Sequence, residues 1–127
     1  IEKSSFRENI ILPGYISGDE KQFLLKNAEA FVYPSNYEGF GIPVIEAFSV
    51  GGLVITNDNS SLREVGGDAA FYILDSKDYN QIFEKMKEVI GLTREDRYIL
   101  GNKGKAWVQQ FSWEKCARET QFLLEHL

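Results

Sequence analysis

The chain has 127 residues, 43% of them hydrophobic and 26% charged, and its 19 acidic and 14 basic residues leave a net charge of -5. This length suits one domain with one core, and the acidic balance excludes a general nucleic-acid binder, which needs a basic face to displace phosphate counterions. No apolar stretch approaches the ~20 residues that cross a membrane, and one cysteine and one histidine exclude an internal disulfide and a cluster of such metal ligands.

The single cysteine is typical of a reducing compartment, so we expect a cytoplasmic location. The N-terminus is neither a start methionine nor a signal peptide. We therefore expect residues 1–127 to be a single domain cut from a longer polypeptide.

The first predicted elements are a strand and a helix. The apolar run Asn9–Gly14 ends in Pro-Gly, which predicts a buried strand and its exit. A helix is expected to start at Ser17 or Asp19, both good N-caps, and to run to about Ala28. Its buried face is expected to carry Phe23, Leu24 and Leu25.

The middle of the chain predicts a strand, a loop, a helix and a second strand. The strand Ala30–Tyr33 is ended by Pro34. After a loop, a helix is expected over about Ile42–Val50, with Pro43 in its first turn, where a missing N–H is tolerated. The apolar run Leu53–Thr56 predicts the next strand.

The remaining residues predict a helical turn, a strand and three helices. The turn is expected at 62–65 and the strand at 69–74. The helices are expected at about 76–90, 94–111 and 113–127, the last two with the N-caps Thr93 and Ser112. Gly101 and Gly104 each weaken the middle helix by about 1 kcal/mol relative to alanine, so a break is expected there.

Short apolar strands that alternate with helices predict the α/β class: a Rossmann-like parallel sheet with helices on both faces. Ligands bind such sheets beyond the carboxyl ends of the strands. The loop from Tyr33 to Gly41 is expected at one of those ends, so we expect the binding site there.

That loop combines glycines, a helix start and two carboxylates. Gly39 and Gly41 leave the backbone open to a ligand, and the N–H groups at the start of the next helix favour phosphate. The carboxylates of Glu38 and Glu46 can accept hydrogen bonds from hydroxyl groups. Taken alone, a Gly-x-Gly before a helix is more often a simple tight turn, and such glutamates are more often solvated surface residues. Together, they favour a ligand with sugars on both sides of a diphosphate, which is a nucleotide sugar.

The segment Phe31–Ala47 resembles the Glu-x7-Glu signature of the retaining glycosyltransferases of family 4, also called group 1, which have the GT-B architecture. The resemblance extends to Gly51-x-x-Val54-Ile55, to Ser61 (or Ser60) with Arg63-Glu64-Val65-x-Gly67-Asp68-Ala69-Ala70, and to Phe111–Glu114. It implies the C-terminal, donor-binding domain. Leu53 departs from the proline common in the family, which should affect local geometry rather than chemistry.

The resemblance implies a role for each matching residue. Glu38, the predicted catalytic residue, would contact the hydroxyls of the donor sugar, and Glu46 would bind the ribose. The predicted substrate-binding backbone around the sugar and the diphosphate is that of Gly39, Phe40, Gly41, Val44 and Ile45. On a looser match, Tyr15 and Ile16 would lie against the base.

We expect no metal requirement, because the chain has no Asp-x-Asp and the helix start would stabilise the leaving diphosphate. Residues 34–52 contain neither lysine nor arginine, and the family's basic pair lies upstream, with the acceptor-binding N-terminal lobe. We therefore expect the isolated chain to bind a nucleotide sugar weakly and to have no transferase activity. Any membrane attachment would arise through the missing lobe.

The aromatic residues Trp107, Phe111, Trp113 and Phe122 are expected to form the packing of the C-terminal helices. The last helix is expected to contact the missing lobe. Two other functions stay open: a GT-B nucleotide-sugar epimerase fragment, and a non-catalytic α/β nucleotide-binding or interaction module.

Overall fold

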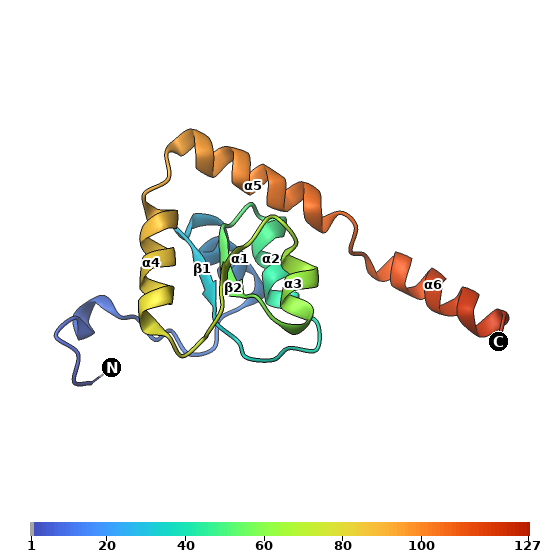
Figure 1. Cartoon of the computed structure of the whole chain (residues 1–127), viewed down its shortest axis with the longest axis horizontal. Coiled ribbons are helices and arrows are strands. Elements are labelled where there is room, and N and C mark those ends of the chain that lie inside the picture. Colours follow the sequence, from blue (N-terminus) through green and yellow to red (C-terminus); the bar gives the residue numbers. More distant parts are fainter. Residues whose placement is uncertain (1) are drawn as a thin grey trace.

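The computed structural model describes residues 2–127 and shows three short parallel strands with helices around them (Figure 1). Ser, Asp and Thr side chains cap four of the helices by accepting hydrogen bonds from their first-turn amides. In chain order, the elements are η1 (Arg7–Asn9), α1 (Gly18–Asn27), β1 (Phe31–Tyr33), α2 (Ile42–Ser49), β2 (Val54–Asn57), α3 (Ser60–Gly66), β3 (Phe71–Ile73), α4 (Tyr79–Ile90), α5 (Arg94–Val108) and α6 (Trp113–Glu125).

The sheet has the order β1-β2-β3, and both strand pairs are parallel. Val32 lies opposite Ile55, and Thr56 lies opposite Tyr72. Each crossover contains a helix, as parallel neighbours require. The predicted α/β class is confirmed.

The core lies on both faces of the sheet because successive side chains of β2 point in opposite directions. Val54 packs with residues of α2 and α3, including Phe48 and Leu62, on one face. Ile55 packs on the other face with Val89 of α4. The predicted cover of helices on both faces is therefore confirmed.

The predicted strand over Asn9–Gly14 is wrong. Asn9 ends the short helix η1, and the residues after it are extended but pair with no strand among residues 2–127. Ile11 is 83% exposed and Leu12 is 73% exposed. An apolar run becomes a strand only where a neighbouring strand accepts its backbone hydrogen bonds, and the described chain supplies none here.

Helix α1 confirms one prediction and corrects another. Ser17 is its N-cap, and the reciprocal hydrogen bonds between Ser17 and Glu20 complete a capping box. Leu25 is buried against the core, as expected. Phe23 and Leu24 were expected on the buried face, but both are exposed, because α2 is the main element that α1 contacts and it does not cover them.

Helix α5 is continuous through Gly101 and Gly104, so the expected break does not occur. Both glycines are buried contact points rather than weak points. A Cβ at position 104 would lie 2.6 Å from the ring of Phe48, and one at position 101 would lie 2.7 Å from the carbonyl oxygen of Gly51. Close packing on α2 therefore compensates for the low helix propensity of glycine.

The other bounds differ by a few residues from those predicted, and Thr93 and Ser112 are the N-caps of α5 and α6, as expected. Strand β3 covers only three of the residues 69–74, α3 is longer than 62–65, and α4 starts at Tyr79 after the cap Asp78. No helix of the described residues is long and apolar enough to span a bilayer.

The prediction that Trp107, Phe111, Trp113 and Phe122 pack the C-terminal helices holds for the first two residues and is wrong for the last two. Trp107 of α5 contacts Phe111 edge-to-face and donates a hydrogen bond to the carbonyl oxygen of Val65 in α3, 2.7 Å away. Helix α6 extends away from the other elements (Figure 1) and has no buried residue. Trp113 is 82% exposed and Phe122 is 61% exposed.

Candidate functional site

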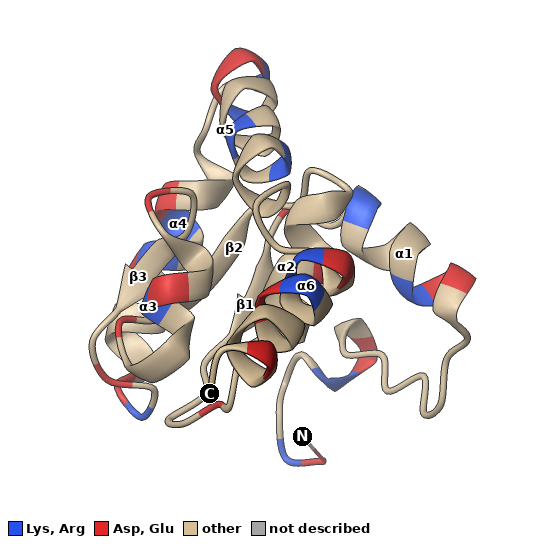
Figure 2. Ribbon diagram, turned by 90° about the vertical axis from the view of Figure 1, so that its right-hand side faces the viewer, with Lys and Arg blue, Asp and Glu red and all other residues tan. Residues whose placement is uncertain are grey.

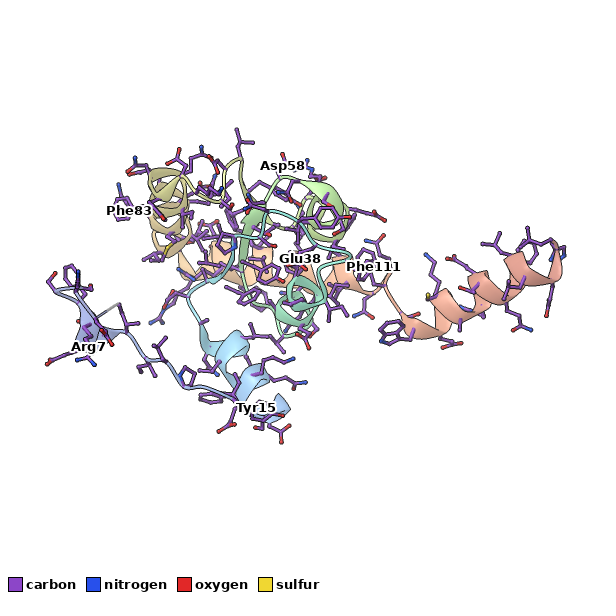
Figure 3. All side chains as sticks on the ribbon, turned by 90° about the horizontal axis from the view of Figure 1, so that it is seen from below. Arg7, Tyr15, Glu38, Asp58, Phe83 and Phe111 are labelled. Carbon is purple, nitrogen blue, oxygen red and sulfur yellow. The ribbon has the colours of Figure 1, made fainter. Side chains whose placement is uncertain are left out.

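The candidate site is the segment that leaves the carboxyl end of β1 and enters α2. The Thr56 hydroxyl donates to the carbonyl oxygen of Tyr33 over 2.9 Å, which ties the end of β1 to β2. The site thus lies at the sheet edge where parallel folds bind ligands. Figure 3 shows Glu38 of this segment in the centre of the molecule, between the strands and α2.

The glycine loop presents backbone N–H groups. None of the hydrogen bonds between described residues uses the N–H of Gly39, Phe40 or Gly41. A Cβ at Gly39 would meet nothing within 4 Å, whereas Gly41 has a φ of 106° and caps α2 in the left-handed conformation. Free amides at the positive end of an eight-residue helix are suited to phosphate oxygens.

Phe40 joins this loop to the C-terminal end of α5. Its ring lies 5.8 Å from that of Phe111 in an edge-to-face arrangement, and Phe111 in turn lies 6.4 Å from Trp107. Such aromatic pairs stabilise by about 0.5–1.5 kcal/mol beyond their buried area. The loop is thereby fixed by a residue 71 positions further along the chain, while Phe40 remains 43% exposed.

Glu38 is held at both its side chain and its backbone. Its Oε1 accepts a hydrogen bond from the Tyr33 hydroxyl over 2.6 Å. This bond lowers the pKa of Glu38, and the nearby Ser35 hydroxyl lowers it further. The carbonyl oxygen of Glu38 accepts from the hydroxyls of Ser61 at 2.8 Å and Ser60 at 3.3 Å. Glu38 is therefore an ionised, oriented acceptor at neutral pH.

Glu46 lies in the second turn of α2 and forms an ion pair with α1. Its Oε1 lies 2.6 Å from Nζ of Lys21, and the two side chains are 36% and 44% exposed. Side chains on a helix tilt toward its N-terminus, so Glu46 reaches back toward the helix start. Along the sequence, one carboxylate therefore precedes the glycine loop and the other follows it, one turn into α2.

A scan against protein families matches residues 1–107 to the model described as glycosyl transferases group 1. This chain belongs to that family. The chain is 38% identical over 109 residues to the O-antigen chain mannosyltransferase B of Escherichia coli. It is 33% identical over 120 residues to an uncharacterised glycosyltransferase of Methanocaldococcus jannaschii, and 29% identical over 112 residues to the MMP alpha-(1->4)-mannosyltransferase of Mycolicibacterium hassiacum.

These alignments cover 84%, 94% and 87% of this chain but only 28%, 34% and 27% of the three relatives. The chain thus spans about a third, or less, of each relative's length. The similarity identifies a group 1 glycosyltransferase domain. The family match over residues 1–107 includes the described elements from η1 to nearly the end of α5.

Within this group 1 glycosyltransferase domain, the predicted site residues do not all lie together. Val44 is fully buried, and its N–H donates to the carbonyl oxygen of Gly41 over 3.0 Å, while Ile45 packs partly buried against the core. Tyr15 is 97% exposed, and Figure 3 shows it beside α1, well apart from Glu38. Ile16, next to it, is half-buried.

Four polar residues that hydrogen-bond to Glu38 or Glu46 were not predicted as site residues: Lys21, Tyr33, Ser60 and Ser61. Tyr33 is an aromatic at the end of an apolar strand, and Lys21 is one of several lysines on a polar helix. Tyr33 and the two serines lie in segments that carry the family resemblance, which was the available signal, whereas Lys21 has no signal that distinguishes it from an ordinary surface residue. No group of three or more potential metal-ligating side chains occurs among residues 2–127.

Proposed function

We propose that this chain is the donor-binding domain of a retaining hexosyltransferase. The complete enzyme would take a sugar from a nucleoside-diphosphate sugar and transfer it to a glycan, polysaccharide or lipid acceptor. The observation that supports this proposal best is the pair of oriented carboxylates, Glu38 and Glu46, which flank in sequence the free amides at the start of α2. That arrangement suits a ligand with hydroxyls on both sides of a diphosphate.

Each part of the site has a separate role in this proposal. The amides of Gly39, Phe40 and Gly41 bind the diphosphate at the positive end of the helix. Glu46 accepts hydrogen bonds from the ribose hydroxyls, and Glu38 accepts them from the hydroxyls of the transferred sugar.

The charge of Glu38 decides what it does in the reaction. Because its pKa is lowered, Glu38 holds no proton at neutral pH and cannot protonate the leaving group. It instead orients the sugar for attack, while the helix amides stabilise the negative charge that grows on the departing diphosphate. Positioning and electrostatic stabilisation are thus the contributions of this domain.

We propose mannose as the transferred sugar. Support comes from the names of the relatives, several of which are mannosyltransferases, including the O-antigen chain mannosyltransferase B and the serotype-specific mannosyltransferase WbdA, both of Escherichia coli. The latter is 34% identical over 114 residues. A competition assay with nucleotide sugars that differ only in the sugar tests this assignment.

The acceptor is proposed to bind a second lobe of the same protein. Helix α6 extends from the domain with Trp113, Phe122, Leu123 and Leu124 exposed, and this apolar surface suits contact with such a lobe. We accordingly expect the isolated chain to bind nucleotides without transferring sugar. Transfer to an acceptor by the isolated chain would contradict this part of the proposal.

A titration of the chain with UDP, GDP and ADP, followed by backbone amide NMR shifts, tests donor binding. We expect at least one nucleotide to shift the amides of Gly39 and Gly41 in a saturable way. The amide of Gly91, at the end of α4, serves as the remote control and should not move. Equal small shifts throughout the chain, or none at Gly39 and Gly41, would contradict the proposal.

A further inference from the structure

The ion pair between Lys21 and Glu46 joins two helices at the proposed nucleotide site. Lys21 Nζ lies 2.6 Å from Glu46 Oε1 although the residues are 25 positions apart in the sequence. Figure 2 shows α1 beside α2, with both basic and acidic segments along α1. Among the described residues, Oε2 of Glu46 accepts no hydrogen bond, so that oxygen stays available to a ligand.

The placement of Lys21 is fixed by the fold of α1. The capping box of Ser17 and Glu20 sets where the helix begins, and the N–H of Lys21 donates to the carbonyl oxygen of Ser17 over 3.0 Å. One turn further along, Leu25 is buried in the same core cluster as Ala47 of α2. The backbone around Lys21 is thus held by the capping box before it and by the buried Leu25 after it, and from there its amine reaches Glu46.

A nucleotide sugar bound at the start of α2 would need a nearby cation to offset the charge of Glu46. Residues 34–52 contain no lysine or arginine, and Glu46 would bring a negative charge close to a diphosphate that is itself negative. The carboxylate of Glu46 and the diphosphate would repel each other, and the repulsion between two charges is stronger at a partly buried site than in water. Lys21 is the cation that the described fold places against Glu46.

We propose that Lys21 is a positioning residue of the nucleotide site, which holds Glu46 by Oε1 and offsets its charge. Oε2 then accepts from the ribose hydroxyls while the diphosphate binds the amides at the start of the same helix. This inference rests on the proposed function and adds to it a residue outside the Glu-x7-Glu segment. An exposed ion pair with only a structural role would contribute little to stability and nothing specific to nucleotide binding.

A double-mutant cycle on the 127-residue chain tests the proposal. The dissociation constant is measured for whichever of UDP, GDP and ADP binds most tightly, with wild type, Lys21→Gln, Glu46→Gln and the double variant. We expect Lys21→Gln to raise the dissociation constant about fivefold when Glu46 is present. When residue 46 is glutamine, the same change should raise it less than about twofold, because the effects of residues in direct contact are not additive. Lys21→Arg should restore binding to within about twofold of wild type.

Lys26→Gln is the matched control because it removes the same charge from the same helix, and Lys26 is exposed and forms no ion pair among the described residues. Its dissociation constant should equal that of wild type. An unchanged constant in Lys21→Gln, or an equal loss in both residue-46 backgrounds, would overturn the role of Lys21 alone. If the wild-type chain binds none of the three nucleotides, the proposed function fails, and this inference fails with it.

Discussion

The hydroxyl of Tyr33 donates a hydrogen bond to Oε1 of Glu38 over 2.6 Å, so the last residue of β1 orients the carboxylate that precedes the glycine loop. The strand fixes the tyrosine, and the tyrosine fixes the glutamate. The same bond lowers the pKa of Glu38 and raises that of Tyr33, because it favours the charged carboxylate and the neutral phenol.

Replacing Tyr33 with phenylalanine should raise the pKa of Glu38 toward its ordinary value, since the hydrogen bond that favours the carboxylate is lost. The side-chain carboxyl carbon of Glu38, followed by NMR across an acid titration, measures this directly. Tyr37→Phe is the control, because Tyr37 is exposed and its hydroxyl bonds to no carboxylate in the described chain. An identical Glu38 titration in wild type and Tyr33→Phe would show that the bond does not form in solution.

The same pair predicts how stability depends on pH. The pKa of Glu38 is lower in the folded chain than in the unfolded chain, so its contribution is present above the ordinary glutamate pKa of about 4.3 and is lost as pH falls through the folded value. Urea unfolding at pH 7 and at pH 3 should therefore differ less for Tyr33→Phe than for wild type. A pH 7 to pH 3 difference in stability as large in Tyr33→Phe as in wild type would show that the Tyr33–Glu38 bond does not contribute to the pH dependence.

Gly104→Ala should destabilise the chain although alanine favours helices. The added methyl would lie 2.6 Å from the Phe48 ring, which is only 1% exposed and has no space to move. Overpacking of this kind costs about 1–3 kcal/mol, and the gain in helix propensity returns about 1 kcal/mol. We expect a net loss of up to about 2 kcal/mol in the free energy of unfolding, measured with urea.

Asn102→Ala is the control for that measurement, because Asn102 is an exposed residue of the same helix. It should leave stability unchanged or raise it by up to about 0.7 kcal/mol. If Gly104→Ala stabilised the chain as Asn102→Ala does, the close contact between α5 and α2 would be refuted.

Phe111→Leu should lower stability by about 1 kcal/mol, because the edge-to-face contacts with Phe40 and Trp107 are lost. The change should also broaden the amide signals of Gly39 and Gly41, whose loop Phe40 anchors. Phe122→Leu is the matched control, since Phe122 is exposed and stacks only on His126. Equal effects of the two variants would argue against an anchored loop.

Features that depend on local chemistry were predictable from the sequence. The N-caps Ser17, Thr93 and Ser112 and the strand end at Pro34 all lie where expected. Each depends on a side chain and the backbone within a few residues of it. The family resemblance, which rests on a continuous segment, is confirmed for the same reason.

Features that depend on contacts between distant residues were not predictable. The run Asn9–Gly14 has the composition of a strand, but strands also need partners. Gly104 has the propensity of a helix breaker, yet Phe48 uses the space that it leaves. The contact of Lys21 with Glu46 crosses 25 residues, and no periodicity of the sequence encodes it.

The central claim is that Glu38 and Glu46 serve different halves of one nucleotide sugar. The most direct test compares Glu38→Gln and Glu46→Gln in binding to a nucleoside diphosphate and to the corresponding nucleotide sugar. We predict that Glu46→Gln weakens the binding of both ligands about tenfold, as expected for the loss of a charged hydrogen bond. Glu38→Gln should weaken the binding of the nucleotide sugar only. The account would be contradicted if both variants weakened both ligands equally, or if neither variant changed either affinity.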